Sequence, residues 1–393
     1  MTQKKGTVLV VGSGMFGVTA SRELQDRGWQ VTLVDPGPIP HPMAASTDIS
    51  KIVRLAYGSD ETYTELMEEA LETWREWNQR WPDPLFHETG VLMLTRTPMT
   101  PGSFEYESFR VLEKRQRRPL RLTSSDLRKR FPGWKAQNYV DGFFQSEGGY
   151  AESGRVVARL AELASAEGVS VRPEVSMAGL VEQGGRVAGI QTSVGERLLA
   201  DQVVVAAGAW TPKLLPHLAG SLTPTAHAIY HLRPPSKRLY TRQLFPVFTA
   251  DISATGWYGF SINRDGIVKI SNHGMGQKLD LDVPRQAAAQ DETPLRRFLE
   301  ETFPTLALLP IVEKRWCFYC DTRDEHFWID RDPQREGLVV AAGDSGHAFK
   351  FAPVMGRIIA DVVEDRPSPV RQKFRWRPEA NPPRGEEESR HHG

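Results

Sequence analysis

The sequence predicts a mixed α/β (α+β) fold in which a domain of parallel strands and helices is interleaved with a second, β-rich domain. An apolar strand, a glycine-rich turn and an amphipathic helix follow one another near the N-terminus. A similar strand, which runs into small residues, recurs at 202–210. Between 224 and 316 the pattern changes to alternating strands. The first domain is therefore expected to be discontinuous in sequence.

The N-terminal segment has the layout of a Rossmann-like dinucleotide-binding βαβ unit. The apolar run Thr7–Val11 is short enough for a buried strand, and a G-x-G-x-x-G pattern follows it directly. Residues 18–27 continue at helical spacing, and a second apolar strand over 30–34 ends in an aspartate. The candidate cofactor-binding residues of this segment are Gly12, Ser13, Gly14, Met15, Phe16, Gly17 and Asp35.

The residue types in this motif suit a bound dinucleotide. Gly12 permits a tight turn, Gly14 lets the backbone approach a pyrophosphate, and Gly17 lets the helix pack closely on the strand. The N–H groups and the positive dipole end at the helix N-terminus attract phosphate. A carboxylate at Asp35 can accept both ribose hydroxyls and disfavours a 2′-phosphate, so FAD or NAD fits better than NADP. The alternative is an ordinary glycine-rich turn between a strand and a helix.

Composition indicates a globular, cytoplasmic enzyme with two domains. A chain of 393 residues is long for one hydrophobic core. Its 49 basic and 49 acidic residues cancel, so no net charge favours nucleic acid or an anionic membrane. Two cysteines argue against a disulfide-built secreted protein. No apolar run approaches the ~20 residues of a membrane span, and the N-terminal run is needed as a strand rather than as a signal peptide.

Apolar periodicity predicts the remaining elements. The basic pair Lys114 and Arg115 is expected to be solvated rather than functional, and the Pro-, Gly- and Glu-rich tail over 378–393 is expected to be disordered. Helices are expected over 61–77, 104–118, 124–130, 153–167 and 353–364. Strands are expected over 87–94, 169–172, 186–191, 202–206, 258–261, 266–271 and 338–342.

The two cysteines form a C-x-x-C pattern, Cys317 to Cys320. A redox dithiol normally lies at a helix N-terminus, but the flanking residues here are of extended type. A four-cysteine zinc site is excluded because the chain has no other cysteine. By pattern alone, two packed thiols are the favoured interpretation.

Three segments in the last third of the chain, 316–319, 324–330 and 343–350, closely resemble the monomeric sarcosine oxidase family. That family belongs to the D-amino-acid-oxidase-like flavoproteins, whose members act on sarcosine, pipecolate, saccharopine, N-methyltryptophan and fructosyl amino acids. The resemblance can be traced across nearly the whole chain. It implies a D-amino-acid-oxidase-like fold, bound FAD and a monomer. It also implies an FAD-binding domain over 1–85, 146–218 and 318–375, and a substrate domain over 86–145 and 219–317.

The resemblance implies a role for several cations and for one cysteine. Cys317 falls on the cysteine that forms a thioether to the flavin ring. Lys51 takes one of two basic positions near the flavin, where sarcosine oxidases have arginine and other members often have lysine. Arg54 and Lys350 match the pair that binds the substrate carboxylate. The alternative for each cation is a surface or structural ion pair.

A second group matches the family's active-site positions. Tyr258, Lys269 and His273 keep the spacing of the active-site tyrosine, the oxygen-activating lysine and a histidine, and Tyr319 matches a pocket tyrosine. The alternatives are a strand lysine that reaches solvent, a structural histidine and a core aromatic ring. Further cofactor-binding candidates from the resemblance are Ser46, Lys51, Val175, Gly208, Trp210, Cys317, Asp344, Gly346, Phe349 and Lys350.

Three departures from the sarcosine oxidase pattern bear on the substrate. Asp344 stands where those enzymes have phenylalanine, Ala348 stands where glycine is usual, and Lys51 replaces arginine. They predict a more polar pocket than that of a strict sarcosine oxidase. The expected activity is oxidation of the C–N bond of a secondary-amine amino acid, with O2 reduced to H2O2, and no nucleic-acid or membrane partner. A dehydrogenase with another electron acceptor and a non-catalytic flavin-binding protein stay open as alternatives.

Overall fold

The computed structural model describes residues 5–278, 280–281 and 292–377, so the expected disordered tail lies outside the described residues. The chain forms two compact units. Within the described residues, the first unit contains 5–49, 152–225 and 318–377, and the second contains 50–151 and 226–317. The second unit thus includes 50–85 and 146–151, which the family resemblance assigns to the FAD-binding domain. The two compact units do not by themselves show which segments bind a cofactor. The division into an FAD-binding domain and a substrate domain therefore stays a prediction.

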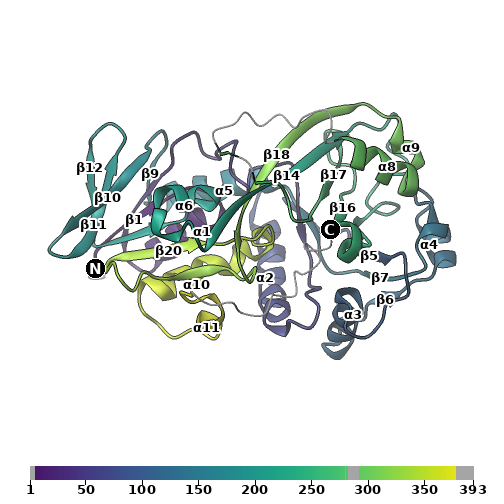
Figure 1. Cartoon of the computed structure of the whole chain (residues 1–393), viewed down its shortest axis with the longest axis horizontal. Coiled ribbons are helices and arrows are strands. Elements are labelled where there is room, and N and C mark those ends of the chain that lie inside the picture. The colour runs from purple at the N-terminus through teal and green to yellow at the C-terminus, as the bar shows by residue number, and fades with distance from the viewer. Residues whose placement is uncertain (1–4, 279, 282–291, 378–393) are drawn as a thin grey trace. The chain divides into compact units, whose positions relative to one another are not determined.

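The first unit is built on a six-stranded sheet with the order β19-β20-β13-β1-β2-β9, of which β1, β9 and β20 are labelled in Figure 1. Every neighbouring pair in it is parallel except β19–β20. Its strands are β1 (Thr7–Val11), β2 (Gln30–Val34), β9 (Ser170–Arg172), β13 (Gln202–Val205), β19 (Trp328–Arg331) and β20 (Leu338–Ala342). Its helices are α1 (Met15–Asp26), α5 (Ser153–Ala166), α6 (Thr211–Leu214), α10 (Ala352–Val363) and α11 (Arg371–Phe374).

Apolar residues cover both faces of this sheet. Helix α1 packs against α5, α10 and β2, and a hydrophobic core on the other side includes Leu9, Val11 and Val203. A three-stranded sheet contributes Val187 and Ile190 to that core. Because the six-stranded sheet is buried on both sides, its strands appear in the sequence as continuous apolar runs. The smaller sheet consists of β10 (Met177–Gln183), β11 (Arg186–Thr192) and β12 (Arg197–Leu199).

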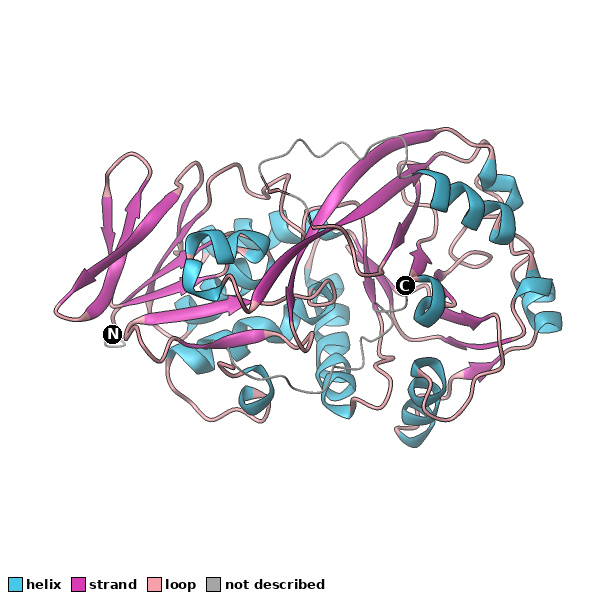
Figure 2. Cartoon of the chain, in the orientation of Figure 1, coloured by secondary structure: helices cyan, strands magenta, loops and turns pink. Residues whose placement is uncertain are grey.

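The second unit contains an eight-stranded, mostly antiparallel sheet, whose strands are magenta in Figure 2. Its order is β18-β14-β17-β16-β15-β5-β7-β6. The strands are β5 (Val91–Thr95), β6 (Leu120–Arg121), β7 (Asp141–Gln145), β14 (Leu222–Leu232), β15 (Val247–Ala250), β16 (Trp257–Gly259), β17 (Val268–Asn272) and β18 (Ile311–Thr322). The helices are α2 (Glu61–Arg80), α3 (Phe104–Lys114), α4 (Ser124–Arg130), α7 (Ile252–Thr255), α8 (Glu292–Thr302) and α9 (Pro304–Ala307).

The two faces of the eight-stranded sheet differ in chemistry. Val268 and Ile270 point into an aromatic-rich core that includes Phe248 and Phe303. Side chains alternate along a strand, so Lys269 points to the opposite face. A small sheet packs on that face through the ring of its Tyr150, which lies 6.2 Å from the ring of Phe260. The small sheet consists of β3 (Lys51–Val53), β4 (Phe86–His87) and β8 (Gly149–Ala151).

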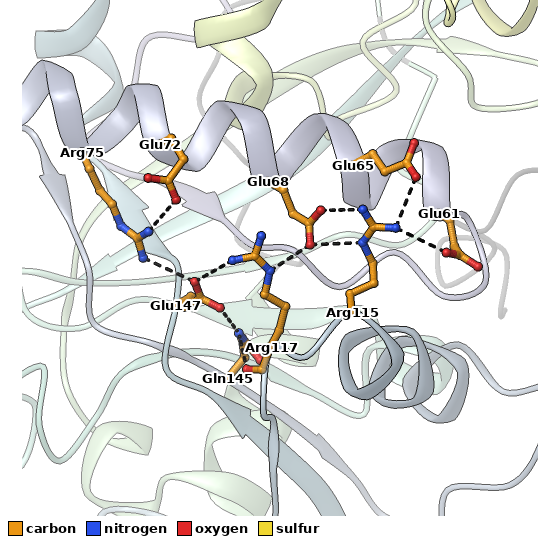
Figure 3. A network of polar contacts seen from close by, with 9 residues as sticks. All are labelled: Glu61, Glu65, Glu68, Glu72, Arg75, Arg115, Arg117, Gln145 and Glu147. Carbon is orange, nitrogen blue, oxygen red and sulfur yellow. Dashed lines mark hydrogen bonds and ion pairs between the residues drawn. The ribbon is translucent and has the colours of Figure 1, made fainter.

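The mixed α/β class predicted from the sequence is confirmed, with local differences. The helix expected over 104–118 ends at Lys114, because Gln116 and Arg118 adopt positive φ values of 59° and 49°. Arg115 is not simply solvated, since it forms ion pairs with glutamates of α2 (Figure 3). The strand expected over 87–94 is two strands, β4 and β5, separated by a turn at Gly90 with a φ of 74°.

A charged cluster joins the N-terminal segment of the first unit to the end of α10. The Glu364 carboxylate accepts hydrogen bonds from Lys5 at 2.6 Å, Trp29 at 3.0 Å and Arg27 at 3.1 Å. Burial alone would raise the pKa of Glu364, but these hydrogen bonds outweigh it and lower the pKa to about 2. The cluster therefore contributes stability while Glu364 is ionised.

Candidate active site

The glycine-rich turn of the first unit has the geometry that its sequence predicts. Gly12 has a φ of 102°, and a Cβ there would lie 2.5 Å from the carbonyl oxygen of Ala206. A Cβ on Gly17 would lie 1.7 Å from the carbonyl oxygen of Gly12, so a side chain at Gly17 would force α1 away from the turn. The backbone N–H groups of the first turn of α1 have no side-chain cap at Gly14. This arrangement fits a bound pyrophosphate.

Ser46 supplies a second observation that fits a cofactor. Its Oγ lies 3.4 Å from the position of a Cβ on Gly14, and it is buried without a hydrogen-bond partner among the described residues. Buried hydroxyl groups normally have partners. An unpaired hydroxyl beside the glycine turn therefore fits a polar group of a bound dinucleotide.

Asp35 lies at the end of β2, next to the glycine turn. Its Oδ2 accepts hydrogen bonds from the backbone N–H and the hydroxyl of Ser13, both at 2.8 Å, and its Oδ1 accepts one from the N–H of Gly37 at 3.2 Å. The carboxylate thus holds the turn in place. A contact of the Asp35 carboxylate with the ribose hydroxyls of a dinucleotide stays a prediction.

The other candidates of the glycine region lie around the ends of β2 and β13. The backbone N–H of Val175 donates to the carbonyl of Asp35 at 2.8 Å. Gly208 begins a short 3₁₀ turn after β13 with a φ of 52°. The ring of Trp210 meets the ring of Phe318 edge-on, with centroids 6.1 Å apart.

The turn after β20 carries four further candidates, among them Phe349, which is buried at the start of a 3₁₀ turn. Asp344 accepts a hydrogen bond from the backbone N–H of Cys320 at 2.7 Å, which ties the turn to β18. A Cβ on Gly346 would lie 2.3 Å from the ring of Tyr319, so this ring packs directly on the turn. The buried Lys350 Nζ donates to the carbonyl oxygen of His347 at 2.6 Å.

The two cysteines occupy different environments. Cys320 belongs to the hydrophobic core of the first unit, and burial, followed by the charge of Asp344, raises the pKa of its thiol well above the usual value. The Cys317 Sγ instead accepts a hydrogen bond from Lys51 Nζ at 3.5 Å. Neither cysteine is in a disulfide. Cys320 is therefore a packed, unreactive thiol, whereas Cys317 has a cation beside its sulfur.

Lys269 is fully buried, with 0 % of its surface exposed. Its Nζ donates a hydrogen bond to the backbone carbonyl of Ser50 at 2.6 Å and lies 4.8 Å from the ring centroid of Phe260. A strand lysine that reaches solvent is thereby excluded. Lysine is almost never fully buried without a partner, because removal of its charge from water is costly. The Ser50 carbonyl and the Phe260 ring offset part of this cost.

Tyr258 and His273 lie close together in the second unit. Their ring centroids are 6.2 Å apart and the rings meet edge-on. Tyr258 also contacts Phe260, at 5.7 Å between centroids, and Phe260 contacts the Lys269 ammonium. Tyr258, His273 and Lys269 are thus brought into one cluster, and their assignment to an active site stays a prediction.

Arg54 and Lys350 belong to different units, so their joint binding of a carboxylate stays a prediction. Arg54 is 4 % exposed, which excludes a surface ion pair. Its Nη1 donates to the carbonyl of Ala56, and its guanidinium lies against the rings of Tyr57 and Phe104.

Comparison with known proteins gives the family. A family model described as FAD-dependent oxidoreductase matches residues 7–362. The chain belongs to this family. It is 30 % identical to the monomeric sarcosine oxidase of Bacillus sp. (strain B-0618) over 361 residues, which cover 91 % of each chain. It is 28 % identical to the N-methyl-L-tryptophan oxidase of Escherichia coli (strain K12 / DH10B) over 369 residues, 93 % of this chain and 96 % of that one.

A solved structure agrees with this placement. The fructosamine oxidase Amadoriase II from Aspergillus fumigatus, in complex with FSA, superposes with a TM-score of 0.84 at 26 % identity. The match covers 96 % of this chain and 91 % of that one. The FAD-dependent oxidoreductase fold expected from the resemblance, with its parallel FAD-binding sheet and mostly antiparallel second sheet, is confirmed.

The structure adds residues that sequence reasoning missed. The Ser50 carbonyl holds Lys269, Phe260 packs against the same ammonium, and Phe104 packs against Arg54. Phe260 could have been found, because it lies two residues from Tyr258 and so on the same side of the strand. No sequence signal joins Ser50 to Lys269 or Phe104 to Arg54.

Among the described residues, no helix is long and apolar enough to span a bilayer.

Proposed function

We propose that this protein is an FAD-dependent oxidase of secondary-amine (N-substituted) amino acids, which oxidises the C–N bond to an imine and reduces O2 to H2O2. Bound FAD would supply the two-electron redox chemistry. The observation that carries the oxidase assignment is the full burial of the Lys269 ammonium in a member of the FAD-dependent oxidoreductase family. A fixed, desolvated cation stabilises the negative charge that develops on O2 as it accepts an electron.

Each candidate residue has a role in this proposal. The turn Gly12–Gly17, with Asp35 and Ser46, holds the FAD phosphates and ribose. Cys317 attaches the cofactor covalently, and the adjacent Lys51 ammonium orients this attachment. Lys51 also supplies positive charge for the reaction with O2, with a smaller share than Lys269. The further cofactor contacts come from Val175, Gly208, Trp210, Asp344, Gly346 and Phe349.

The substrate would be held by its carboxylate and by the rings around its amine. Arg54 offers parallel N–H donors to a carboxylate, and Lys350 adds a second cation. Tyr258, His273 and Tyr319 line the site and exclude water. The proposal needs no dedicated general base, because a neutral amine carries no proton that must be removed before oxidation.

The relatives support this class of substrate without naming one. The relatives include a monomeric sarcosine oxidase, an N-methyl-L-tryptophan oxidase and a fructosamine oxidase. The substrate in each of these names is an amine whose nitrogen carries a further carbon group. Lys51, Asp344 and Ala348 favour a substrate that is larger or more polar than sarcosine. We further propose that the enzyme is a cytoplasmic monomer.

A peroxide-coupled screen tests the function. The FAD-loaded protein is mixed with sarcosine, N-methyl-L-tryptophan, pipecolate, saccharopine and fructosyl amino acids, and with glycine and tryptophan as primary-amine controls. We expect at least one N-substituted amino acid to yield one H2O2 for each O2 consumed. Turnover with an artificial acceptor but without O2 consumption would show a dehydrogenase instead. No reduction of the flavin by any of these compounds under anaerobic conditions would contradict the proposal.

A further inference from the structure

Two aromatic rings pack against the guanidinium of Arg54. Its Cζ lies 4.5 Å from the ring centroid of Tyr57 and 5.5 Å from that of Phe104. A hydrogen bond from Nη1 to the Ala56 carbonyl fixes one edge of the group. Aromatic faces attract guanidinium groups, because the ring quadrupole is negative there. These contacts together define the plane of the guanidinium.

The first ring is itself held firmly. Tyr57 is fully buried, and its ring stacks on Tyr63 with centroids 4.9 Å apart and an interplanar angle of 27°. Tyr63 lies in the first turn of α2, where its backbone N–H donates to the N-cap residue Asp60. The position of Tyr57 is therefore set by the start of α2.

The second ring is set by α3. Phe104 is the first residue of this helix, and the carboxylate of the next residue, Glu105, accepts hydrogen bonds from Ser253 Oγ at 2.8 and 2.9 Å. One turn later, Ser108 Oγ accepts a hydrogen bond at 2.8 Å from the backbone N–H of Gly58, in the segment that follows Tyr57. The start of α3 is thus fixed both to the turn before Tyr258 and to the segment after Arg54.

Ion pairs fix the other end of α3 to α2. Arg115 pairs with Glu68 at 2.6 Å, and Arg117 pairs with both Glu68 and Glu147 (Figure 3). The acidic partners on α2 recur every three or four residues, so they share one face of the helix. They are Glu61, Glu65 and Glu68. Helices α2 and α3 are therefore joined to each other, with Phe104 on α3 and Tyr57 stacked on Tyr63 of α2.

We propose that Phe104 and Tyr57 are positioning residues, which hold the Arg54 guanidinium in the plane needed to bind a substrate carboxylate through two N–H groups. This inference rests on the proposed function, in which Arg54 binds that carboxylate. Two parallel hydrogen bonds to a carboxylate require a defined plane, and a rotated guanidinium loses one of them. Phe104 is 50 residues from Arg54 in sequence and contacts it through a cation–π interaction.

Binding of acetate to the FAD-loaded protein tests this inference. Acetate serves as the carboxylate probe and acetamide as its uncharged counterpart, and binding is measured from the change in the visible spectrum of the flavin. We expect Phe104→Leu to raise the Kd for acetate about three- to thirtyfold, as expected for the loss of one cation–π contact. Phe104→Tyr keeps a ring and should stay close to the unmodified protein, and acetamide binding should not respond to either change.

A matched control separates positioning from general damage. Phe109 is a second buried phenylalanine of α3, and its ring contacts Phe143. Phe109→Leu removes the same ring volume from the same helix and should leave acetate binding unchanged. If it weakens acetate binding as much as Phe104→Leu does, or if Phe104→Leu keeps the original Kd, the positioning inference is wrong.

The Arg54→Met variant distinguishes this inference from the proposed function. If Arg54→Met abolishes acetate binding while Phe104→Leu does not change it, only the positioning inference fails. If the unmodified protein does not bind acetate, or if Arg54→Met binds it equally well, the carboxylate site itself is contradicted, and with it the proposed role of Arg54.

Discussion

Replacement of Lys269 by methionine should slow the reaction with O2 much more than the reaction with the amine substrate. Methionine keeps the length of the side chain and removes its charge. The Nζ is fully buried, and the aromatic group nearest to it among its described contacts, Phe260, has its ring centroid 4.8 Å away. A group that packs against this lysine as Phe260 does therefore lies about 5 Å from a desolvated unit charge.

The magnitude follows from that separation. At about 5 Å and an effective dielectric constant of about 20, two unit charges interact by roughly 3 kcal/mol. Loss of this stabilisation at the electron transfer to O2 corresponds to a slowing of at least ~100-fold. The substitution also leaves the Ser50 carbonyl without its buried donor, which should cost about 1–3 kcal/mol of folding stability.

Stopped-flow spectroscopy measures the two half-reactions separately. Flavin reduction by substrate is followed without oxygen, and re-oxidation is followed after reduced enzyme is mixed with O2. Lys314→Met is a suitable control, because Lys314 is a lysine of the same unit that pairs with Glu292 at 3.1 Å. It should leave both rates unchanged. Equal slowing of both half-reactions in Lys269→Met would refute the assignment of Lys269 to O2 and would indicate general damage to the site.

Three further predictions concern the cofactor, the substrate and stability. Acid precipitation of the unmodified protein should leave the flavin in the pellet, whereas Cys317→Ala should release it to the supernatant and Cys320→Ala should not; free flavin from the unmodified protein would contradict covalent attachment. Arg54→Met should lower kcat/KM for an acidic substrate about ten- to a hundredfold, since one charge-assisted contact contributes about 1.5–3 kcal/mol, and an unchanged value would exclude a carboxylate contact. Because the folded-state pKa of Glu364 is lowered from 4.5 to about 2, its stabilisation is present above pH 4.5 and is lost as the pH falls toward 2. Glu364→Gln should therefore lower the Tm at pH 7, and this difference should shrink in acid; a Tm difference independent of pH would argue against the charged cluster.

Local pattern made the nucleotide-binding half of the protein predictable. A strand, a glycine turn and a helix that follow one another within 30 residues leave few alternatives, because the spacing of this motif is local. The Gly17 contact with the Gly12 carbonyl joins residues only five positions apart. Cys317 and Lys269 were identified by resemblance, since a lone cysteine or lysine carries no pattern of its own.

Element boundaries were less predictable than the elements themselves. The helical periodicity of 104–118 continues past Lys114, but left-handed backbone conformations at Gln116 and Arg118 end the helix there. The ion pairs of Arg115 and Arg117 with α2 accompany this turn, and their partners lie about 50 residues earlier in the chain. Periodicity in a single segment contains no information about such partners.

The sequence by itself determined the fold class, the dinucleotide motif and the identity of the candidate residues. Only the tertiary structure decided their environments. Lys269 is buried because its ammonium meets a carbonyl 219 residues away in sequence, at Ser50, and the Arg54 guanidinium lies against a ring of helix α3. The burial of a charge depends on which distant groups replace its water shell. The packing of strands and helices determines which groups replace the water shell, and the sequence neighbours of the charged residue do not.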